Sequence, residues 1–262
     1  MPRANRILLP GQVWHITHRC HNREFLLKFG RDRCYWHRWL FESRKRFGLC
    51  VLNYVATSNH IHLLVKDQGL GEIPKSILLI AGCTAQAYNH RKKRRGAYWE
   101  DRYHATAVDT QDYLAQCMVY VDLNMVRAGA VAHPGDWDVC GYREIHNPPK
   151  RYRVIDMIAL VELLELNDMK AVQQVHSHWV EEALRRGRVE RDGRWSDALA
   201  VGSHHFVSQF HEGLGIGGYH RKINQVGDTY LLREDAGCYR NSIEVEKAIL
   251  STTNRADIDL TT

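Results

Sequence analysis

Residues 49–66, LCVLNYVATSNHIHLLVK, contain two runs of apolar and β-branched side chains separated by a short polar segment. Such runs are typical of β-strands, and a polar turn between two of them is typical of a hairpin. We therefore predict strands over Leu49–Ala56 and His60–Lys66, joined by a turn at residues 57–59. The fold class then depends on what flanks this hairpin.

The sequence on both sides of the hairpin alternates between strand and helix patterns. The segment before it predicts a strand over Gln12–Cys20 and a helix over Arg31–Phe47 that ends at Gly48. The segment after it predicts the helix Ile73–His90, the strand Tyr98–Val108 and the helix Thr110–Ala128. The order β-α-β-β-α-β is that of the split βαβ, or ferredoxin-like, plan. We expect an α+β fold with an antiparallel sheet and helices on one of its faces.

A boundary is expected near residues 147–150, where two prolines occur and the composition changes. It divides the chain into residues 1–148 and 149–262, and the second part is expected to be mostly α-helical. Helices are predicted over Val154–Leu166, Met169–Arg186 and Trp195–His211. Trp179, Trp195 and Phe206 are interpreted as core residues, and the pairs His176/His178 and His204/His205 as structural. This part could dock on the first part, contact DNA or mediate dimerisation.

The charge is distributed unevenly over the 262 residues. Apolar residues make up 44% and charged residues 25%, as in a globular protein. The net charge is +6, but residues 1–150 hold 22 basic and 13 acidic side chains, whereas residues 151–262 hold 14 and 17. The first part is therefore +9 and the second −3, which indicates that the first part meets a polyanion.

Neither a membrane nor a disulfide framework is expected. No apolar run approaches the roughly 18 residues of a membrane-spanning helix. The seven cysteines are odd in number, scattered and without a CxxC pair. Free thiols in a reducing compartment fit this pattern best, so we expect a cytoplasmic protein.

His60 and His62 are the first candidates for chemistry. In a strand, residues i and i+2 point to the same face, so the two imidazoles should lie side by side with Ile61 facing the other way. Two neutral imidazoles can hold a divalent transition metal and leave positions open for a substrate. The alternative is a pair of ordinary surface or core histidines, because the chain contains 16 histidines.

Tyr120 and Asn124 are the second candidates. At i and i+4 they share a face of the predicted helix. A tyrosine can act as a covalent nucleophile next to a bound cation, and Asn124 could offer an oxygen to that cation. The alternative is that Tyr120 is a packing residue, and Tyr113 and Tyr103 are the next candidates for a nucleophile.

Taken together, these segments resemble a known family. SNHIHLLV (residues 58–65) is similar to the HUH motif of single-tyrosine transposases, and YVDLNMVRAGAV (120–131) is similar to their tyrosine helix. HITHRCHNREF (15–25) and YWEDRYHA (98–105) match the REP-associated tyrosine transposases, a branch of this IS200-like family. The resemblance covers about residues 3–146 and implies a HUH catalytic domain over 1–148. Thr57-Ser58 and Met125 depart from the family pattern, which often has Met-Pro and Pro there.

The resemblance implies a metal-dependent, single-stranded DNA endonuclease and strand transferase. His60, His62 and Asn124 would hold Mg²⁺ or Mn²⁺, and Tyr120 would attack the scissile phosphate to form a 5′-phosphotyrosine. Family members act on hairpins of repetitive palindromic DNA. Two other functions remain open: a non-catalytic DNA- or RNA-hairpin binder that kept the fold, and, less favoured, a small-molecule metal hydrolase. A monomer and a homodimer fit the sequence equally well.

Basic side chains in the first part are the main candidates for binding DNA. Arg91–Arg95 are five consecutive basic residues, which could also simply end a helix favourably. Tyr98 and Trp99 follow them and are expected to offer stacking faces. The complete set of DNA-binding candidates is Arg19, Asn22, Arg23, Arg91, Lys92, Lys93, Arg94, Arg95, Arg102 and Arg127.

Overall fold

A computed structural model describes residues 8–187 and 191–234 of the chain. Its strands are β1 (Val13–Arg19), β2 (Cys50–Ala56), β3 (His60–Lys66), β4 (His104–Val108), β5 (Ala200–Gly202), β6 (Arg221–Val226) and β7 (Thr229–Glu234). Its α-helices are α1 (Gly30–Phe47), α2 (Glu72–Lys92), α3 (Asp112–Asp122), α4 (Asn124–Arg127), α5 (Gly141–His146), α6 (Met157–Leu163), α7 (Met169–Arg185), α8 (Arg194–Asp197) and α9 (His204–Gly213). Short 3₁₀ turns are η1 (His21–Arg23), η2 (Pro134–Asp136) and η3 (Gly215–Gly218).

The first four strands have the ferredoxin-like arrangement, so this prediction is confirmed. They lie in the order β2-β3-β1-β4, and all neighbours are antiparallel. The predicted hairpin is present, and α1 ends where Gly48 adopts a left-handed conformation with φ 73°, which glycine tolerates without strain. The strand expected from Tyr98 begins only at His104, because Trp99 makes just an isolated bridge to Cys20.

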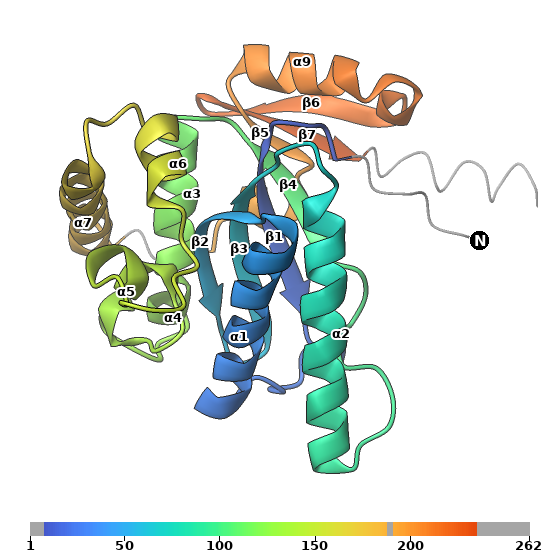
Figure 1. Cartoon of the computed structure of the whole chain (residues 1–262). Coiled ribbons are helices and arrows are strands. Elements are labelled where there is room, and N and C mark those ends of the chain that lie inside the picture. Colours follow the sequence, from blue (N-terminus) through green and yellow to red (C-terminus); the bar gives the residue numbers. More distant parts are fainter. Residues whose placement is uncertain (1–7, 188–190, 235–262) are drawn as a thin grey trace, which may run out of the picture.

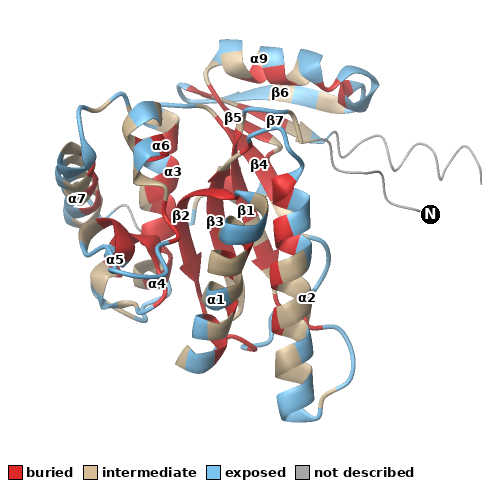
Figure 2. Ribbon diagram, in the orientation of Figure 1, coloured by how far each residue is buried: buried red, intermediate tan, exposed pale blue. Residues whose placement is uncertain are grey.

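Helices cover both faces of this sheet, so the expectation of a single covered face is wrong (Figure 1). On one face, Ile61 lies in a small apolar space with Trp36 of α1 and Ile77 of α2. The opposite face lies against α3, because residues 112–127 cross it as helices. Every residue of β2 is buried between the two layers (Figure 2). The histidines at alternate positions of β3 therefore face α3.

The second part of the chain continues the same sheet. β5 pairs with β4 in parallel, and β7 and β6 follow it in antiparallel pairing, so the sheet has seven strands. Helices still predominate in this part as predicted, with α7 packed against α3. The division at residue 148 stays a prediction, and residues 235–262 lie outside the described part.

The single helix expected over Trp195–His211 is wrong, because β5 interrupts it. A Cβ atom on Gly202 would lie 2.5 Å from Cβ of Asp109 and 2.6 Å from Cδ1 of Phe206, so the chain passes through a space that only glycine fits. The carboxylate of Asp109 accepts hydrogen bonds from the amide and the hydroxyl of Ser203 at 3.0 and 2.8 Å. Ser203 in turn caps α9, which explains why a new helix begins there.

The described residues contain no helix that is long and apolar enough to cross a membrane. Six cysteines in this part are free thiols. The seventh, Cys238, lies outside it.

Candidate active site

His60 and His62 lie on the face of β3 that meets α3. Their ring centroids are 4.9 Å apart, and both side chains line one cavity. Ile61 points into the apolar layer on the other side. The alternation that the HxH spacing predicts is therefore present.

His62 is held by a second histidine, His15, on the neighbouring strand β1. Nε2 of His15 and Nδ1 of His62 are 2.9 Å apart, and the two rings are nearly parallel, with centroids 5.0 Å apart. Nδ1 of His15 lies 2.8 Å from the backbone carbonyl oxygen of Trp195. All three residues are buried. Two hydrogen bonds thus connect the second part of the chain to His62.

These hydrogen bonds determine where the protons lie. A carbonyl oxygen only accepts, so Nδ1 of His15 carries the proton that it donates to Trp195. Burial lowers the pKa of His15 to about 4, so at neutral pH its Nε2 accepts a hydrogen bond from Nδ1 of His62. Burial, aided by His60, also lowers the pKa of His62 well below its ordinary value. His62 is then neutral with an unprotonated Nε2, the form in which imidazole binds a metal.

His60 has the same form for a different reason. Its Nδ1 lies 2.7 Å from Oδ1 of Asn59 and 3.0 Å from Oγ1 of Thr57, so it donates to an oxygen of the turn. Burial, with a contribution from Arg19, lowers the pKa of His60 to about 4. Its Nε2 is therefore also unprotonated at neutral pH. Thr57, which departs from the family pattern, helps to hold this ring.

Asn124 reaches the same two histidines. Its Nδ2 lies 2.7 Å from Nε2 of His62. A half-turn of the amide exchanges Nδ2 with Oδ1 and would offer an oxygen at this point. The single helix expected over Thr110–Ala128 is wrong. The helix α3 begins only at Asp112, and Leu123 interrupts the helical conformation between α3 and α4. Both Tyr120 and Asn124 nevertheless face His62, as their spacing predicts.

The Tyr120 ring lies between the histidines and an arginine. Its centroid is 5.7 Å from that of His62 and 6.0 Å from that of His15. The guanidinium carbon of Arg127 lies 4.4 Å from the ring centroid. Burial raises the pKa of the Tyr120 hydroxyl, whereas Arg127 and Arg191 act in the opposite direction. The two cations thus favour the phenolate that a nucleophilic tyrosine must approach.

The other two candidate tyrosines lie elsewhere. The hydroxyl of Tyr113 donates to the carbonyl oxygen of Asp228 at 3.2 Å, beside the β6–β7 hairpin. Tyr103 contacts His18, whose ring stacks on Trp99. Tyr120 contacts His62, with ring centroids 5.7 Å apart.

These residues border a cavity of about 380 Å³. Its wall is mixed in charge and comes from β1, β3, β4, α3, α4 and the segment before β5. The lining residues are Thr17, His18, Arg19, His60, His62, Glu100, Asp101, Arg102, His104, Tyr120, Asn124, Arg127, Arg191, Ser196 and Asp197.

The donor set at this cavity fits a divalent ion only with help from Asn124. Within residues 8–187 and 191–234, no three His, Cys, Asp or Glu side chains come together as a metal site. His60 and His62 offer two unprotonated nitrogens, and the Asn124 amide can offer one oxygen. Three protein ligands of this kind leave positions for phosphate oxygens and water.

The candidate DNA-binding residues fall into three places. Arg19, Arg102 and Arg127 line the cavity. Asn22 and Arg23 are exposed on η1, and the Arg23 carbonyl accepts a hydrogen bond from Asn59, next to His60. Arg91–Arg95 lie at the end of α2, farther from the cavity.

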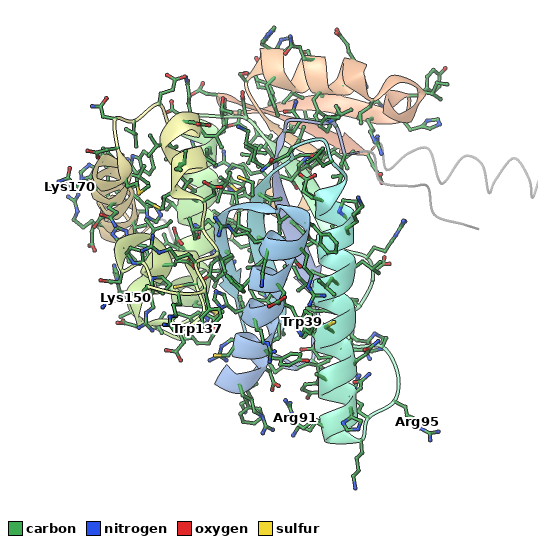
Figure 3. The ribbon with its side chains drawn as sticks, in the orientation of Figure 1. Trp39, Arg91, Arg95, Trp137, Lys150 and Lys170 are labelled. Carbon is green, nitrogen blue, oxygen red and sulfur yellow. The ribbon has the colours of Figure 1, made fainter. Side chains whose placement is uncertain are left out.

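The Arg91–Arg95 segment is only partly available. Arg91 pairs with the buried Asp32 at 2.5 Å, and Arg94 pairs with Glu24 at 3.6 Å. Lys92, Lys93 and Arg95 are exposed. Figure 3 shows Arg91 and Arg95 at the end of α2 that lies farthest from α9.

The expected stacking role of the aromatic residues after this segment is not supported. Tyr98 is only 2% exposed, so the expectation is wrong for it. One face of Trp99 is covered by His18, with ring centroids 4.1 Å apart, and its Nε1 donates to the Ala81 carbonyl. Both residues pack the end of the sheet.

Sequence reasoning missed His15 and the contribution of the second part of the chain. His15 and Thr17 are two residues apart on β1 and so point to the same face of the sheet. Thr17 is paired with His62, so the pairing of β1 with β3 would have placed His15 beside His62. Trp195 is core as predicted, at 1% exposed, but its carbonyl also positions His15. Arg191 reaches the cavity from the part of the chain whose net charge is negative.

Comparison with known proteins identifies the part of the chain that carries this site. Residues 11–124 match the sequence model of the family described as IS200-like transposases. These residues form an IS200-like transposase domain. The match includes His15, His60, His62, Tyr120 and Asn124, so the family resemblance drawn from the sequence is confirmed.

Two solved structures are similar to this chain. One is a REP-associated tyrosine transposase bound to a REP hairpin, with 17% identity, a TM-score of 0.47, and coverage of 60% of this chain and 94% of that chain. The other is a putative transposase from Deinococcus radiodurans, with 15% identity, a TM-score of 0.33, and coverage of 45% of this chain and 95% of that chain. No sequence among curated proteins matches the chain.

Proposed function

We propose that the protein is a metal-dependent endonuclease and strand transferase that acts on single-stranded DNA through a 5′-phosphotyrosine at Tyr120. The observation that carries the proposal is the meeting of Tyr120, His60, His62 and Asn124 at one cavity inside a transposase domain. Metal binding requires a neutral imidazole with an unprotonated nitrogen, and both His60 and His62 have this form at the cavity.

His60, His62 and Asn124 are the residues that would hold Mg²⁺ or Mn²⁺. When bound, such an ion neutralises negative charge that develops on the phosphate under attack. His15 holds His62 in the binding tautomer, and burial keeps both imidazoles neutral at physiological pH. The protein thus supplies a prepared set of ligands on a rigid strand.

Tyr120 supplies the nucleophile. Its phenolic oxygen forms a bond to phosphorus while the bond from phosphorus to the 3′-oxygen breaks, and the phenolic proton ends on the released 3′-hydroxyl. Arg127 lies against the ring and, with Arg191, favours the charge that forms on the oxygen. Attack by a free 3′-hydroxyl on the same phosphotyrosine reverses the step and joins strands, so cleavage and transfer share one chemistry.

The DNA that we propose is a hairpin of repetitive palindromic sequence, with its single-stranded foot in the cavity. Arg19, Arg102 and Arg127 would contact the scissile region, and Asn22 and Arg23 the adjacent nucleotides. Lys92, Lys93 and Arg95 would follow the backbone farther out. The +9 charge of residues 1–150 supports a polyanionic substrate. A cytoplasmic location remains a prediction from the free cysteines.

An adduct assay tests this function. The full-length protein is incubated with a labelled single-stranded hairpin and Mn²⁺, and products are separated on a denaturing gel. We expect the wild-type protein to form a covalent adduct. Tyr120→Phe should abolish the adduct without abolishing hairpin binding, and Tyr113→Phe should leave the amount of adduct unchanged. We also expect the double substitution His60→Ala and His62→Ala to abolish it.

Two results would reject the proposal. An adduct that survives Tyr120→Phe would move the nucleophile to another residue. A wild-type protein that binds hairpins tightly but never yields an adduct would favour the non-catalytic hairpin binder.

A further inference from the structure

A second cavity, of about 680 Å³, lies on the other side of Tyr120 between α3 and α7. Tyr120, Arg127 and Arg191 line both this cavity and the one with the histidines. A DNA strand with its phosphate at Tyr120 therefore has a partly open cavity beside that phosphate. Much of the wall comes from residues 179–187 and 191–195, which lie outside the part that matches the transposase family.

Part of the wall of the second cavity is aromatic and aliphatic, and this part is flanked by charged side chains that include Asp112, Glu182 and Asp192. Trp179 of α7 lines it together with Val119, Leu123 and Ala183. Gln116 adds an amide to the same wall. An aromatic and aliphatic wall of this kind is typical of sites that bind aromatic rings.

The arginines of the wall differ in how closely a carboxylate pairs with them, and the two with the weakest pairing, Arg127 and Arg191, lie next to Tyr120. Arg186 pairs with Glu182, and Arg194 pairs with Asp192, so these two charges are compensated. Arg127 and Arg191 stand where the two cavities meet. Nε of Arg127 is buried without a hydrogen-bond partner among the described residues, and Arg191 lies 4.0 Å from its nearest carboxylate partner, Asp197.

This arrangement matches the chemistry of a nucleotide, which has an anion at one end and a planar base at the other. The volume falls within the roughly 300–1,000 Å³ of pockets that enclose small organic molecules. We propose that the second cavity binds the unpaired nucleoside attached to the phosphate that Tyr120 attacks, with its base stacked on Trp179. The second part of the chain would then determine which base is accepted at the cleavage point.

The proposal rests on the proposed function for the position of the phosphate, but base binding does not require cleavage. It is therefore tested with the full-length Tyr120→Phe variant in EDTA, so that no adduct forms. The probe is a hexathymidylate with a single 5-bromodeoxyuridine, moved position by position. Ultraviolet cross-links are mapped by peptide mass spectrometry, and affinity is measured by fluorescence anisotropy against the same oligonucleotide with one abasic position.

We expect cross-links to Trp179 from one position of the oligonucleotide. We expect Trp179→Ala to weaken binding about tenfold and to remove the preference for a base over an abasic position, because stacking is lost. Trp179→Phe keeps a stacking face and should retain the preference. Ala183→Trp, which fills the cavity without removing the aromatic wall, should remove it. Tyr219→Ala, at an exposed aromatic outside the cavity, is the control.

Cross-links that map elsewhere, or a base preference that survives both Trp179→Ala and Ala183→Trp, would overturn the proposal. The adduct assay separates this failure from failure of the proposed function. An adduct without cross-links at Trp179 rejects only the nucleoside site. Cross-links at Trp179 without any adduct support the site and reject the nuclease.

Discussion

His15 offers a test of how the site is built, because it touches no substrate and acts only through His62. His15→Phe keeps an aromatic ring in the core but removes both hydrogen bonds of the chain from the Trp195 carbonyl to His62. His62 is then free to carry its proton on Nε2, where it cannot bind a metal. Loss of such a supporting hydrogen bond typically weakens metal binding about 10- to 100-fold. That corresponds to about 1.4–2.8 kcal/mol.

The assay is calorimetric titration of the full-length protein with Mn²⁺. We expect the dissociation constant of His15→Phe to rise by that factor. The substitution also leaves the buried N–H of His62 unpaired, at a cost of about 1–3 kcal/mol of folding stability. The Trp195 carbonyl keeps only a long hydrogen bond from the Thr106 hydroxyl, at 3.4 Å. Chemical denaturation therefore has to show that the variant is still folded at the titration temperature.

His18→Phe is the matched control. His18 is a buried histidine on the same strand that borders the same cavity, but its ring stacks on Trp99 and its Nε2 lies 2.8 Å from the carbonyl oxygen of Asp101. It should lose stability without a comparable loss of Mn²⁺ affinity. A folded His15→Phe protein that binds Mn²⁺ as tightly as the wild type would refute the tautomer argument.

Two further predictions concern DNA affinity and stability. Replacing Lys92, Lys93 and Arg95 by alanine should make the slope of log K against log salt shallower by about 2, since each single-strand phosphate contact contributes about 0.7. Glu144→Gln should lower the free energy of unfolding at pH 7 by about 1–3 kcal/mol, because a buried acceptor for the amides of Val154 and Ile155 loses its charge.

The first of these is checked by hairpin binding at several salt concentrations. Its control replaces Lys150, Arg151 and Lys170, which are exposed; Figure 3 shows Lys150 and Lys170 on the opposite side of the molecule from Arg95. An equal change of slope in both variants would remove the specific role of the α2 end.

The Glu144 effect has a defined pH window. Burial opposes ionisation of Glu144, but hydrogen bonds from His37, from two backbone amides and from Tyr54 lower its pKa below the ordinary value of 4.5. The contribution of ionised Glu144 to the free energy of unfolding is therefore complete above the ordinary pKa of 4.5, and it is lost as the pH falls through the lower pKa of the folded protein. Denaturation of wild type and variant should differ at pH 7 and converge in acid; a constant difference would contradict the assignment.

The order of the first six elements could be predicted from the sequence because each has a strong local signal. The β2–β3 hairpin consists of two apolar, β-branched runs separated by a short polar turn, and Gly48 ends α1. The HxH spacing also placed His60 and His62 on one face, because strand geometry alone decides that. Helix spacing likewise directed Tyr120 and Asn124 to one side.

The remainder depends on tertiary contacts that local patterns do not encode. β5 is only three residues long and exists because it pairs with β4 and because Gly202 fits against Asp109. His15 acquires its role from strand register, and Trp195 acquires its role through a backbone carbonyl. The net charge of −3 for residues 151–262 gave no indication that Arg191 lines the cavity, because carboxylates elsewhere in this part outweigh its charge in the sum.

The most direct test of the central claim is to locate the covalent bond between protein and DNA. The adduct formed with a single-stranded hairpin and Mn²⁺ is digested with trypsin and nuclease. The expected peptide, residues 103–127, contains Tyr103, Tyr113 and Tyr120, so fragmentation has to assign the added nucleotide mass. The proposal predicts a 5′-phosphate ester on Tyr120 between Met118 and Val121. A mass on another tyrosine, or no modified peptide from a protein that binds the hairpin, would contradict it.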